Sequence, residues 1–353
     1  MRALLVRPQQ PGSVALEEVA DPSPRRDEML VEGLAVGVCG TDKEIIEGHY
    51  GWAPPGRQNL VLGHESLGRV LRAPADSGFT AGDLVAGVVR RPDPVPCGAC
   101  AAGEFDMCRN GRYTERGIKQ IDGYGAQQWC VESGYAVKLD PVLGRVGVLI
   151  EPTSVVAKAW EQIERIGNRS WFRPERALIT GAGAIGLLAA LIAAQRGLEV
   201  HVLDRVTHGP KPELVRTLGG TYHTRNVTEV LKAVRPDIVI EATGAPDVVF
   251  DVICGTPAYG IACMTGVSSG GRRMTVDAGM LNRELVLDND AVFGSVNANL
   301  RHYQQAARAL AEADMAWLER LITRRVPLDH WQEAFTGTSD DVKVVIALSP
   351  QAE

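Results

Sequence analysis

Residues 177–195 read ALITGAGAIGLLAALIAAQ, nineteen residues without a charge. A stretch of this length and composition can cross a bilayer. Its glycines, however, stand between a short strand-like run, 177–180, and a helix-like run. Strand, glycine turn and helix, in that order, form a phosphate-binding loop. We therefore interpret the stretch as the start of a buried βαβ unit rather than as a membrane helix.

The glycines Gly181, Gly183 and Gly186 fit the pattern G-x-G-x-x-G. The first permits a tight turn, the second lets the backbone approach a pyrophosphate, and the third packs helix against strand. The alternative, glycines that serve only packing, is disfavoured because strand, helix and a downstream acid are all in place. We also assign Ala184, Ile185, Thr243 and Asn297 to the cofactor site.

The acid is Asp204, eighteen residues after Gly186, at the end of the run EVHVLD. A carboxylate there can accept both hydroxyls of the adenosine ribose of NAD and would repel a 2′-phosphate. The neighbouring Arg205 can pair with such a phosphate or stack on adenine. The sequence therefore predicts a nicotinamide cofactor, with NAD preferred over NADP.

The regions before and after this loop differ in their pattern of predicted strands and helices. Residues 1–150 are rich in Gly and Pro with short β-type runs such as 59–62 and 84–89, which predicts an irregular all-β domain. From about Val155 strand and helix signals alternate, as in a parallel sheet with helices on both faces. A helical pattern over 302–326 and a closing strand, VKVVIALS, follow. We expect a catalytic domain of residues 1–155 and 296–353 and a nucleotide domain of residues 156–295.

The composition of the 353-residue chain is ordinary for a globular protein of two domains, with 45% hydrophobic and 23% charged residues. A net charge of −6 argues against nucleic-acid and anionic-membrane partners and favours a small molecule. The opening MRALLVRPQQPG has too short an apolar run for a secretory signal, so we expect a cytoplasmic protein.

The seven cysteines are an odd number, and Cys97, Cys100 and Cys108 lie within twelve residues, which indicates metal binding rather than disulfides. Cys130, Cys254 and Cys263 lie in apolar settings and are expected to be buried thiols.

Three further motifs carry metal-ligand chemistry. They are Cys39-Gly-Thr41-Asp42, then Gly63-His64-Glu65, and finally Glu151-Pro152. A thiolate, an imidazole and a carboxylate are the ligands of an open catalytic zinc site. Taken alone, each of these residues is better explained without a metal, Cys39 as a small buried hydrophobe, His64 as a core histidine, and Glu65 and Glu151 as surface charges.

The order of these motifs, with the cysteine-rich lobe and the glycine loop, resembles the zinc-dependent medium-chain dehydrogenase/reductase superfamily over essentially the whole chain. The stretches LVLGHESLG, YTERGI, LIEPTSVVAKA and GSVNAN look like the archaeal type of glucose 1-dehydrogenase and its bacterial relatives. The resemblance implies an α/β protein with a GroES-like β-rich catalytic domain and a doubly wound, parallel-sheet Rossmann domain. It also implies a homodimer or homotetramer.

Within that resemblance, Cys39, His64 and Glu151 ligate the catalytic zinc, and Glu65 is an exchangeable ligand or an outer partner. Zinc lowers the pKa of the C1 hydroxyl of an aldose, hydride passes to the nicotinamide, and the product is a lactone. The resemblance implies that Thr41 would take the hydroxyl proton. The route of the proton beyond Thr41 is open, because Glu44 occupies the position of the usual relay histidine. Glu44, His49 or the cofactor ribose could carry the proton onward. The implied substrate-binding residues are Thr41, Glu115, Glu151 and Asn297.

The cysteine lobe departs from the family pattern of four ligands. This chain supplies the last three, and the first falls at Pro94. Asp93, one residue away, is a candidate oxygen ligand, so we predict a structural zinc on Cys97, Cys100, Cys108 and Asp93, the alternative being a metal-free lobe.

Two further departures bear on the substrate. Val89 stands where some members have asparagine, and a histidine near residues 287–288 is missing. The first hypothesis is therefore an aldose 1-dehydrogenase for glucose or a close relative, and the alternative is a biosynthetic polyol or cyclitol dehydrogenase. A non-catalytic member is disfavoured because a binding protein needs no open metal site.

Overall fold

The protein is described from a computed structural model, which covers residues 1–268, 270 and 272–350. The chain forms two compact units. Unit 1 comprises residues 1–154 and the chain from residue 297 on, and unit 2 comprises residues 155–296. The predicted boundaries, after residues 155 and 295, each lie one residue from these crossings.

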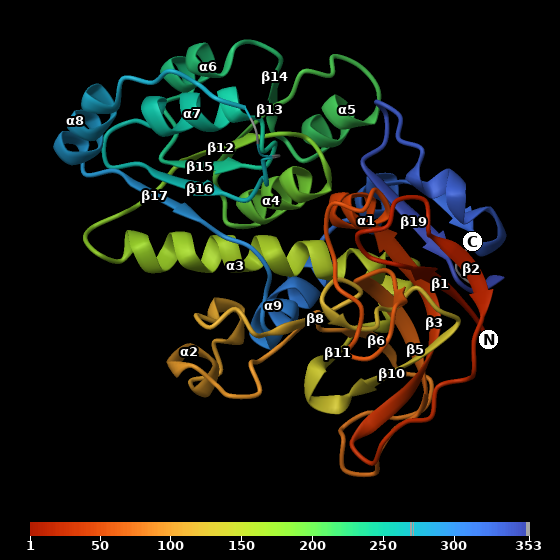
Figure 1. The fold of residues 1–353 in the computed structure, drawn as a ribbon. Coiled ribbons are helices and arrows are strands. Elements are labelled where there is room, and N and C mark those ends of the chain that lie inside the picture. The colour runs from red at the N-terminus through yellow and green to blue at the C-terminus, as the bar shows by residue number, and fades with distance from the viewer. Residues whose placement is uncertain (269, 271, 351–353) are drawn as a thin grey trace. The chain divides into compact units, whose positions relative to one another are not determined.

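Unit 1 is built from β-sheets (Figure 1). One small sheet has the order β2-β1-β4 and another the order β7-β8-β9. The main sheet has the order β11-β6-β5-β3-β19-β18, and β10 also pairs with β3. The strands are β1 Arg2–Val6, β2 Ala15–Glu18, β3 Glu28–Val38, β4 Leu60–Val61, β5 Glu65–Arg72, β6 Leu84–Gly87, β7 Arg90–Arg91, β8 Thr114–Arg116, β9 Gln120–Ile121, β10 Gln128–Glu132, β11 Ala136–Lys138, β18 Ile322–Pro327 and β19 Lys343–Ala347.

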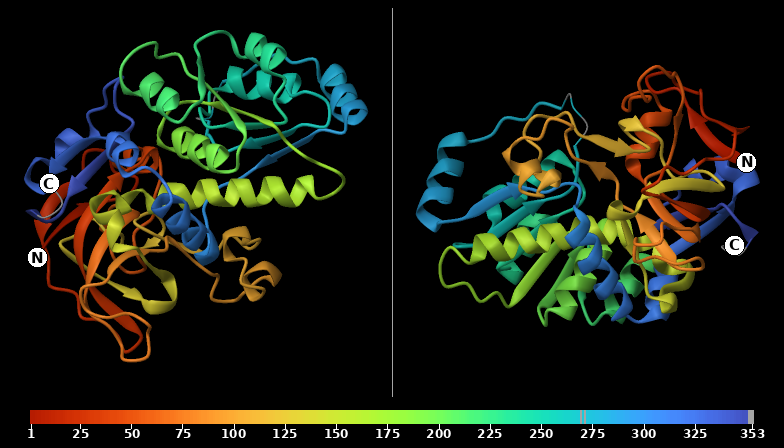
Figure 2. Two further views of the ribbon diagram at one scale, coloured as in Figure 1. Left: turned by 180° about the vertical axis from the view of Figure 1, so that it is seen from behind. Right: turned by 90° about the horizontal axis from the view of Figure 1, so that it is seen from below.

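The main sheet joins the two ends of the chain. Strand β3 alternates buried and less buried residues at its start, where Met29 and Val31 face the core, and is buried over most of its second half. The predicted closing strand is β19, which pairs antiparallel with β3. Both views of Figure 2 show the blue C-terminal strands against the red N-terminal ones.

One sequence prediction fails at this point. The helical pattern expected over 302–326 ends early, because residues 322–327 form β18, parallel to β19. The β-branched residues Ile322 and Val326 are buried there, and pairing with β19 outweighs local helix propensity.

The helical segments of unit 1 are α1 Gly40–Ile46, α2 Gly98–Ala101, α9 Leu300–Ala311 and α10 Met315–Leu321, with 3₁₀ turns η1 Phe105–Met107, η2 Ser133–Tyr135, η3 Pro141–Leu149 and η4 Leu328–Phe335. Helix α3, Ile150–Gly167, contains the first crossing between the units.

Unit 2 is a Rossmann fold. Its sheet is parallel throughout, with the order β14-β13-β12-β15-β16-β17. In Figure 1, α4 lies on one side of this sheet and α6 and α7 on the other, as alternating βα units require. The strands are β12 Arg176–Thr180, β13 Glu199–Leu203, β14 Thr221–His223, β15 Ile238–Glu241, β16 Ile261–Met264 and β17 Ala291–Gly294, and the helices are α4 Ala184–Gln195, α5 Pro210–Thr217, α6 Val227–Val234, α7 Pro246–Gly255 and α8 Ala278–Asp288.

The uncharged stretch 177–195 is divided between β12 and α4. Residues Ala177 to Thr180 and the middle of α4 are almost completely buried, which accounts for their apolarity. Among the described residues, no helix has the length and hydropathy needed to cross a membrane.

The three cysteines outside the ligand motifs differ in burial. Cys263 is buried in β16 and Cys130 is partly buried in β10, but Cys254 is exposed. The prediction of a buried thiol is therefore wrong for Cys254, which lies on α7, where only Val252 is buried.

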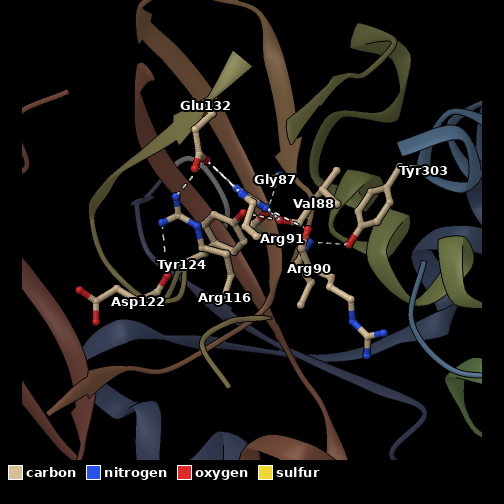
Figure 3. Close-up of polar contacts among 11 residues, drawn as sticks. Gly87, Val88, Arg90, Arg91, Arg116, Asp122, Tyr124, Glu132 and Tyr303 are labelled. Atoms are coloured by element: carbon tan, nitrogen blue, oxygen red, sulfur yellow. Dashed lines mark hydrogen bonds and ion pairs between the residues drawn. The ribbon is translucent and has the colours of Figure 1, made fainter. Parts of the chain in front are cut away.

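A buried ion network braces the middle of unit 1 (Figure 3). The Arg91 guanidinium donates to Glu132 from Nη2 at 2.7 Å and from Nε at 3.2 Å, and Arg116 approaches the same carboxylate at 3.4 Å. Burial alone would raise the pKa of Glu132, but its bonds to Arg91 and the nearby charge of Arg116 lower that pKa to about 2.

We expect Glu132→Gln to destabilise the protein in a pH-dependent way. A carboxylate with a lowered folded-state pKa contributes stability above its unfolded pKa, near 4.5, and loses it as the pH falls toward 2. At pH 7 the free energy of unfolding should be lower than that of the parent by about 1–3 kcal/mol, because Glu132 is partly exposed and solvent screens its charge. The difference should shrink below about pH 4.5. Denaturant titrations between pH 7 and 3 measure it, with exposed Glu18→Gln as control. A difference independent of pH contradicts the role of the charge.

Candidate active site

The first site residue, Cys39, follows β3 and caps the N-terminus of α1. Its backbone N–H donates to Asp42 Oδ2 at 2.9 Å, which holds the turn. The Thr41 hydroxyl lies on the first turn of the helix, with Oγ1 4.0 Å from Cys39 Sγ. The end of a central strand therefore presents a thiol and a hydroxyl side by side.

His64 enters the site through a turn between β4 and β5. The preceding Gly63 has φ of 91°, a left-handed conformation that favours glycine. His64 Nδ1 lies 3.2 Å from Asp42 Oδ1, which leaves Nε2 as the nitrogen free for a metal. Burial disfavours the imidazolium, but Asp42 more than offsets this effect and raises the pKa of His64 well above its usual range. Metal binding would therefore displace a proton.

Glu65, the next residue, is almost completely buried and is paired with a lysine that the sequence analysis did not identify. Lys343 Nζ contacts the Glu65 carboxylate and donates to the Val38 carbonyl at 3.1 Å. A Cβ on Gly37 would lie 2.0 Å from Glu65 Oε2, so this side chain depends on a glycine in the neighbouring strand. The cost of burying two charges is offset only when the two groups are in close contact with good geometry.

The side chains of Cys39, His64 and Glu65 form a close donor group. One ligand atom from each lies within 4.8 Å of the others. Sulfur, nitrogen and oxygen donors in a largely buried setting match the ligand set of a zinc ion with an open coordination position. These residues therefore fit a catalytic zinc.

Glu151, the predicted third ligand, lies outside that close group. It lies in the first turn of α3. Burial and the nearby Glu65 and Asp42 carboxylates raise the pKa of Glu151 to about 7, while His64 and Lys343 oppose the shift, so Glu151 lies near the same residues. In this arrangement Glu65 is nearer to the ligand position than Glu151.

The predicted relay residues lie toward the surface. Glu44, on α1, and His49 are exposed, and His49 Nδ1 is 3.5 Å from Glu47 Oε2. Tyr50 lies close enough to Glu115 and Glu44 for both carboxylates to raise its pKa, although burial contributes most. Glu44 and Glu115 therefore both lie near Tyr50.

The cysteine lobe contains a second donor group. Ligand atoms of Cys97, Cys100 and Cys108 lie within 4.8 Å of one another. The Arg109 N–H donates to Cys97 Sγ at 3.4 Å, and this bond with others from the backbone lowers the pKa of the Cys97 thiol to about 6. A thiol that ionises this readily is suited to bind zinc.

Asp93 is not part of the lobe's close group. Its Oδ1 accepts from the Val95 N–H at 2.8 Å, and its Oδ2 accepts from Asn110 Nδ2 at 2.8 Å. Arg112 lies 3.4 Å from the same oxygen. The carboxylate would have to exchange these partners to reach a metal.

Glu115 and Asn297, the predicted substrate residues, are in direct contact in unit 1. Asn297 Nδ2 donates to Glu115 Oε1 at 2.5 Å, and Asn297 Oδ1 accepts from the Ala298 N–H at 2.7 Å. Asn297 has φ of 63°, a left-handed conformation that asparagine adopts more readily than most residues. Tyr303, on α9, lies near Glu151. Burial and, after it, Glu151 raise the pKa of Tyr303 well above its usual range, and its hydroxyl accepts from the Val89 N–H at 3.3 Å.

The glycine loop of unit 2 has the geometry that its sequence predicts. Gly181 has φ of 92° and Gly183 caps α4, while a Cβ on Gly186 would lie 1.8 Å from the Gly181 carbonyl oxygen. The strand order changes direction at β12, so the loop lies at the switch point of the sheet. Ala184 and Ile185 begin α4, where backbone N–H groups have no helical acceptor.

Asp204 and Thr243 lie beside this loop. Asp204 Oδ2 accepts from the Ala182 N–H at 2.7 Å and lies 3.7 Å from Lys211 Nζ, and Oδ1 accepts from the Val206 N–H at 3.0 Å. Thr243 Cγ2 would be 3.0 Å from a Cβ on Gly181. Arg205 is exposed, and Asn297 belongs to unit 1.

Comparison with known proteins decides the family. The family model described as alcohol dehydrogenase GroES-like domain matches residues 25–141, and that described as glucose dehydrogenase C-terminus matches residues 144–348. Glucose 1-dehydrogenase of Methanocella arvoryzae is 39% identical over 99% of each chain. The chain belongs to the glucose 1-dehydrogenase family. It is thus a zinc-dependent medium-chain dehydrogenase, an oxidoreductase that acts on CH–OH groups with a nicotinamide cofactor.

Other members of the family show the same relation. Glucose 1-dehydrogenase of Thermoproteus tenax is 40% identical, covering 98% of this chain and 99% of the relative. The solved glucose dehydrogenase of Haloferax mediterranei, in complex with NADP, Zn and gluconolactone, has a TM-score of 0.91 at 32% identity and covers 99% of both chains. The resemblance expected from the motifs is therefore confirmed, as is the fold.

Proposed function

We propose that the chain oxidises an aldose, glucose or a close relative, at C1 to the lactone and transfers hydride to NAD or NADP. The observation that carries this proposal is the Glu115–Asn297 pair, hydrogen-bonding groups for sugar hydroxyls in the same unit as the Cys39–His64–Glu65 donor group. A site built to hydrogen-bond hydroxyls discriminates strongly against molecules that lack them. Identities of 32–40% to glucose dehydrogenases support the same substrate class.

We assign each site residue a separate role in this reaction. Bound zinc supplies a Lewis acid that lowers the pKa of the C1 hydroxyl. Thr41, beside Cys39, would accept the hydroxyl proton, and a bound nicotinamide would supply the hydride acceptor that oxidation of C1 to the lactone requires. Glu115 and Asn297 orient the ring through its other hydroxyls. From Thr41, the proton leaves through Glu44, His49 or the cofactor ribose.

We assign the zinc ligands to Cys39 and His64 with one carboxylate. Glu65 lies in the close donor group, and Glu151 is the alternative carboxylate, close enough to His64 and Glu65 for their charges to shift its pKa. When Glu65 is not a ligand, Lys343 keeps its charge compensated. Asp42 fixes the ring of His64 through Nδ1. A carboxylate is a usual partner of the ring nitrogen that does not bind the zinc.

A substrate panel tests the function. We expect nicotinamide reduction with aldoses, glucose first, and little with polyols, cyclitols and simple alcohols. A strict requirement for a cyclitol or polyol would support the alternative, a biosynthetic dehydrogenase of that class, and activity with no aldose would reject the proposal. Product analysis should find one lactone per reduced cofactor.

For the cofactor we propose NAD in preference to NADP. Asp204 follows β13 and has the charge that repels a 2′-phosphate. Lys211 and Arg205 are cations that favour the phosphate, and the Haloferax mediterranei enzyme was solved with NADP. The ratio of kcat/KM for the two cofactors measures the preference, and a strong preference for NADP would overturn the role of Asp204.

Three further assignments remain proposals. The lobe cysteines, with Asp93 or another donor as fourth ligand, hold a structural zinc. The protein forms a homodimer or homotetramer and works in the cytoplasm. Metal analysis and sedimentation test the first two directly.

A further inference from the structure

The carboxylate of Glu115 is held by an arginine directly across the strand pair. Arg90 and Glu115 are register partners in β7 and β8, and both are almost completely buried. Arg90 Nε and Nη2 both donate to Glu115 Oε1, at 3.1 and 2.9 Å. Two donors from one guanidinium fix the position of that oxygen.

The guanidinium of Arg90 is itself fixed on its remaining sides. Nη1 donates to the Asp106 carbonyl at 3.0 Å, and the Arg90 Cζ lies 3.7 Å from the centre of the Tyr113 ring. Asp106 in turn accepts from Asn299 Nδ2 at 2.8 Å, at the start of α9. A planar cation that is stacked and bonded along its edge has little freedom to turn.

The bonds to Glu115 are unequal between its two oxygens. Oε1 accepts from Arg90 twice and from Asn297 Nδ2 once. Oε2 has no protein donor within hydrogen-bond distance among residues 1–268, 270 and 272–350. Asn297 beside it is partly exposed. The carboxylate therefore keeps one acceptor oxygen for a ligand.

We propose that Arg90 is a positioning residue that determines sugar specificity, because it saturates Glu115 Oε1 and so directs Oε2 to accept one hydroxyl of the aldose. This inference rests on the proposed function. It predicts that Arg90 acts on discrimination between a sugar and its deoxy analogue. A purely structural arginine would affect both substrates equally.

The neighbouring Arg91 offers a matched comparison. It is equally buried, is paired with a carboxylate, Glu132, and lies 4.2 Å from the ring centre of a tyrosine, Tyr135. Figure 3 shows Arg91 reaching toward Glu132 while Arg90 extends away from that carboxylate. The two arginines thus have the same kind of surroundings, and only Arg90 contacts Glu115.

The test compares glucose with 2-deoxyglucose and 3-deoxyglucose in the zinc-loaded full-length enzyme. For Arg90→Met we expect kcat/KM for glucose to fall about tenfold to hundredfold, mainly through KM, since hydrogen bonds to a charged group are lost. The ratio of kcat/KM for glucose to that for one of the deoxy sugars should fall by a similar factor. Arg91→Met should lower the melting temperature and leave these ratios unchanged.

Arg90→Lys is the second variant, in case Arg90→Met does not fold. Lysine keeps the charge but not the fork, so we expect an intermediate ratio. Parent-like ratios in every folded Arg90 variant, or an equal change in Arg91→Met, would overturn the inference. If the parent enzyme oxidises no aldose, it is the proposed function that fails.

Discussion

Replacing Cys39 with Ser is expected to abolish turnover while leaving the fold intact. Loss of a zinc ligand removes several kcal/mol of transition-state stabilisation, which corresponds to a fall in kcat on the order of a thousandfold or more. Serine is a favourable N-cap residue, and the bond from the residue 39 N–H to Asp42 is a backbone bond, so α1 should be retained. Steady-state kinetics and metal analysis on the same preparation measure the effect.

Metal content makes this prediction specific. The Cys39→Ser protein should lose one zinc per chain and keep the structural zinc proposed for Cys97, Cys100 and Cys108, because the two donor groups are separate. Cys130→Ser is the control, since Cys130 belongs to neither group. A Cys39→Ser enzyme with parental zinc content and turnover would contradict the assignment.

The second large effect is expected in the glycine loop, where two neighbouring glycines should respond differently to alanine. A Cβ on Gly186 would lie 1.8 Å from the Gly181 carbonyl, so Gly186→Ala must displace α4 from β12. We expect a loss of at least about 3 kcal/mol in the stability of unit 2, followed by loss of cofactor binding. Thermal unfolding and cofactor titration report the two effects.

Gly183→Ala is the comparison variant that separates an effect on cofactor binding from an effect on stability. Its backbone has φ of −80°, which alanine adopts, and apart from its immediate chain neighbours and nearby helix backbone no described protein atom lies within 4 Å of the added Cβ. We expect stability within about 1 kcal/mol of the parent but at least about tenfold weaker cofactor binding, because the methyl group keeps the pyrophosphate from the backbone. Unchanged cofactor affinity in Gly183→Ala would place the phosphates elsewhere.

The sequence predicted those features that depend on local pattern. The order of strand, glycines and helix located the glycine loop between β12 and α4, since each glycine has a distinct steric role along a few residues. The alternation of strand and helix from Val155 predicted the parallel sheet of unit 2. The helix expected through residue 326 failed because a long-range partner, β19, decided the conformation of 322–327.

Residues that act through long-range pairing escaped prediction. Lys343 contacts Glu65 across 278 residues of sequence, and its only signal was a lysine inside an otherwise apolar closing strand. Asp42 is part of the Cys39-Gly-Thr41-Asp42 motif, but its contact with His64 depends on the pairing of β3 with β5, which the motif does not predict. Arg90 gave no signal that distinguished it from Arg91, because only the strand register decides which of them faces Glu115.

The central claim is that zinc at the Cys39–His64–carboxylate site is required for oxidation of an aldose at C1. The most direct measurement is turnover of glucose by enzyme stripped with a chelator and then titrated with zinc, with the product identified. We predict that turnover is lost on stripping, that it returns in proportion to added zinc, and that the product is the lactone. Full turnover without zinc, or recovery of activity only with polyols, would contradict the claim.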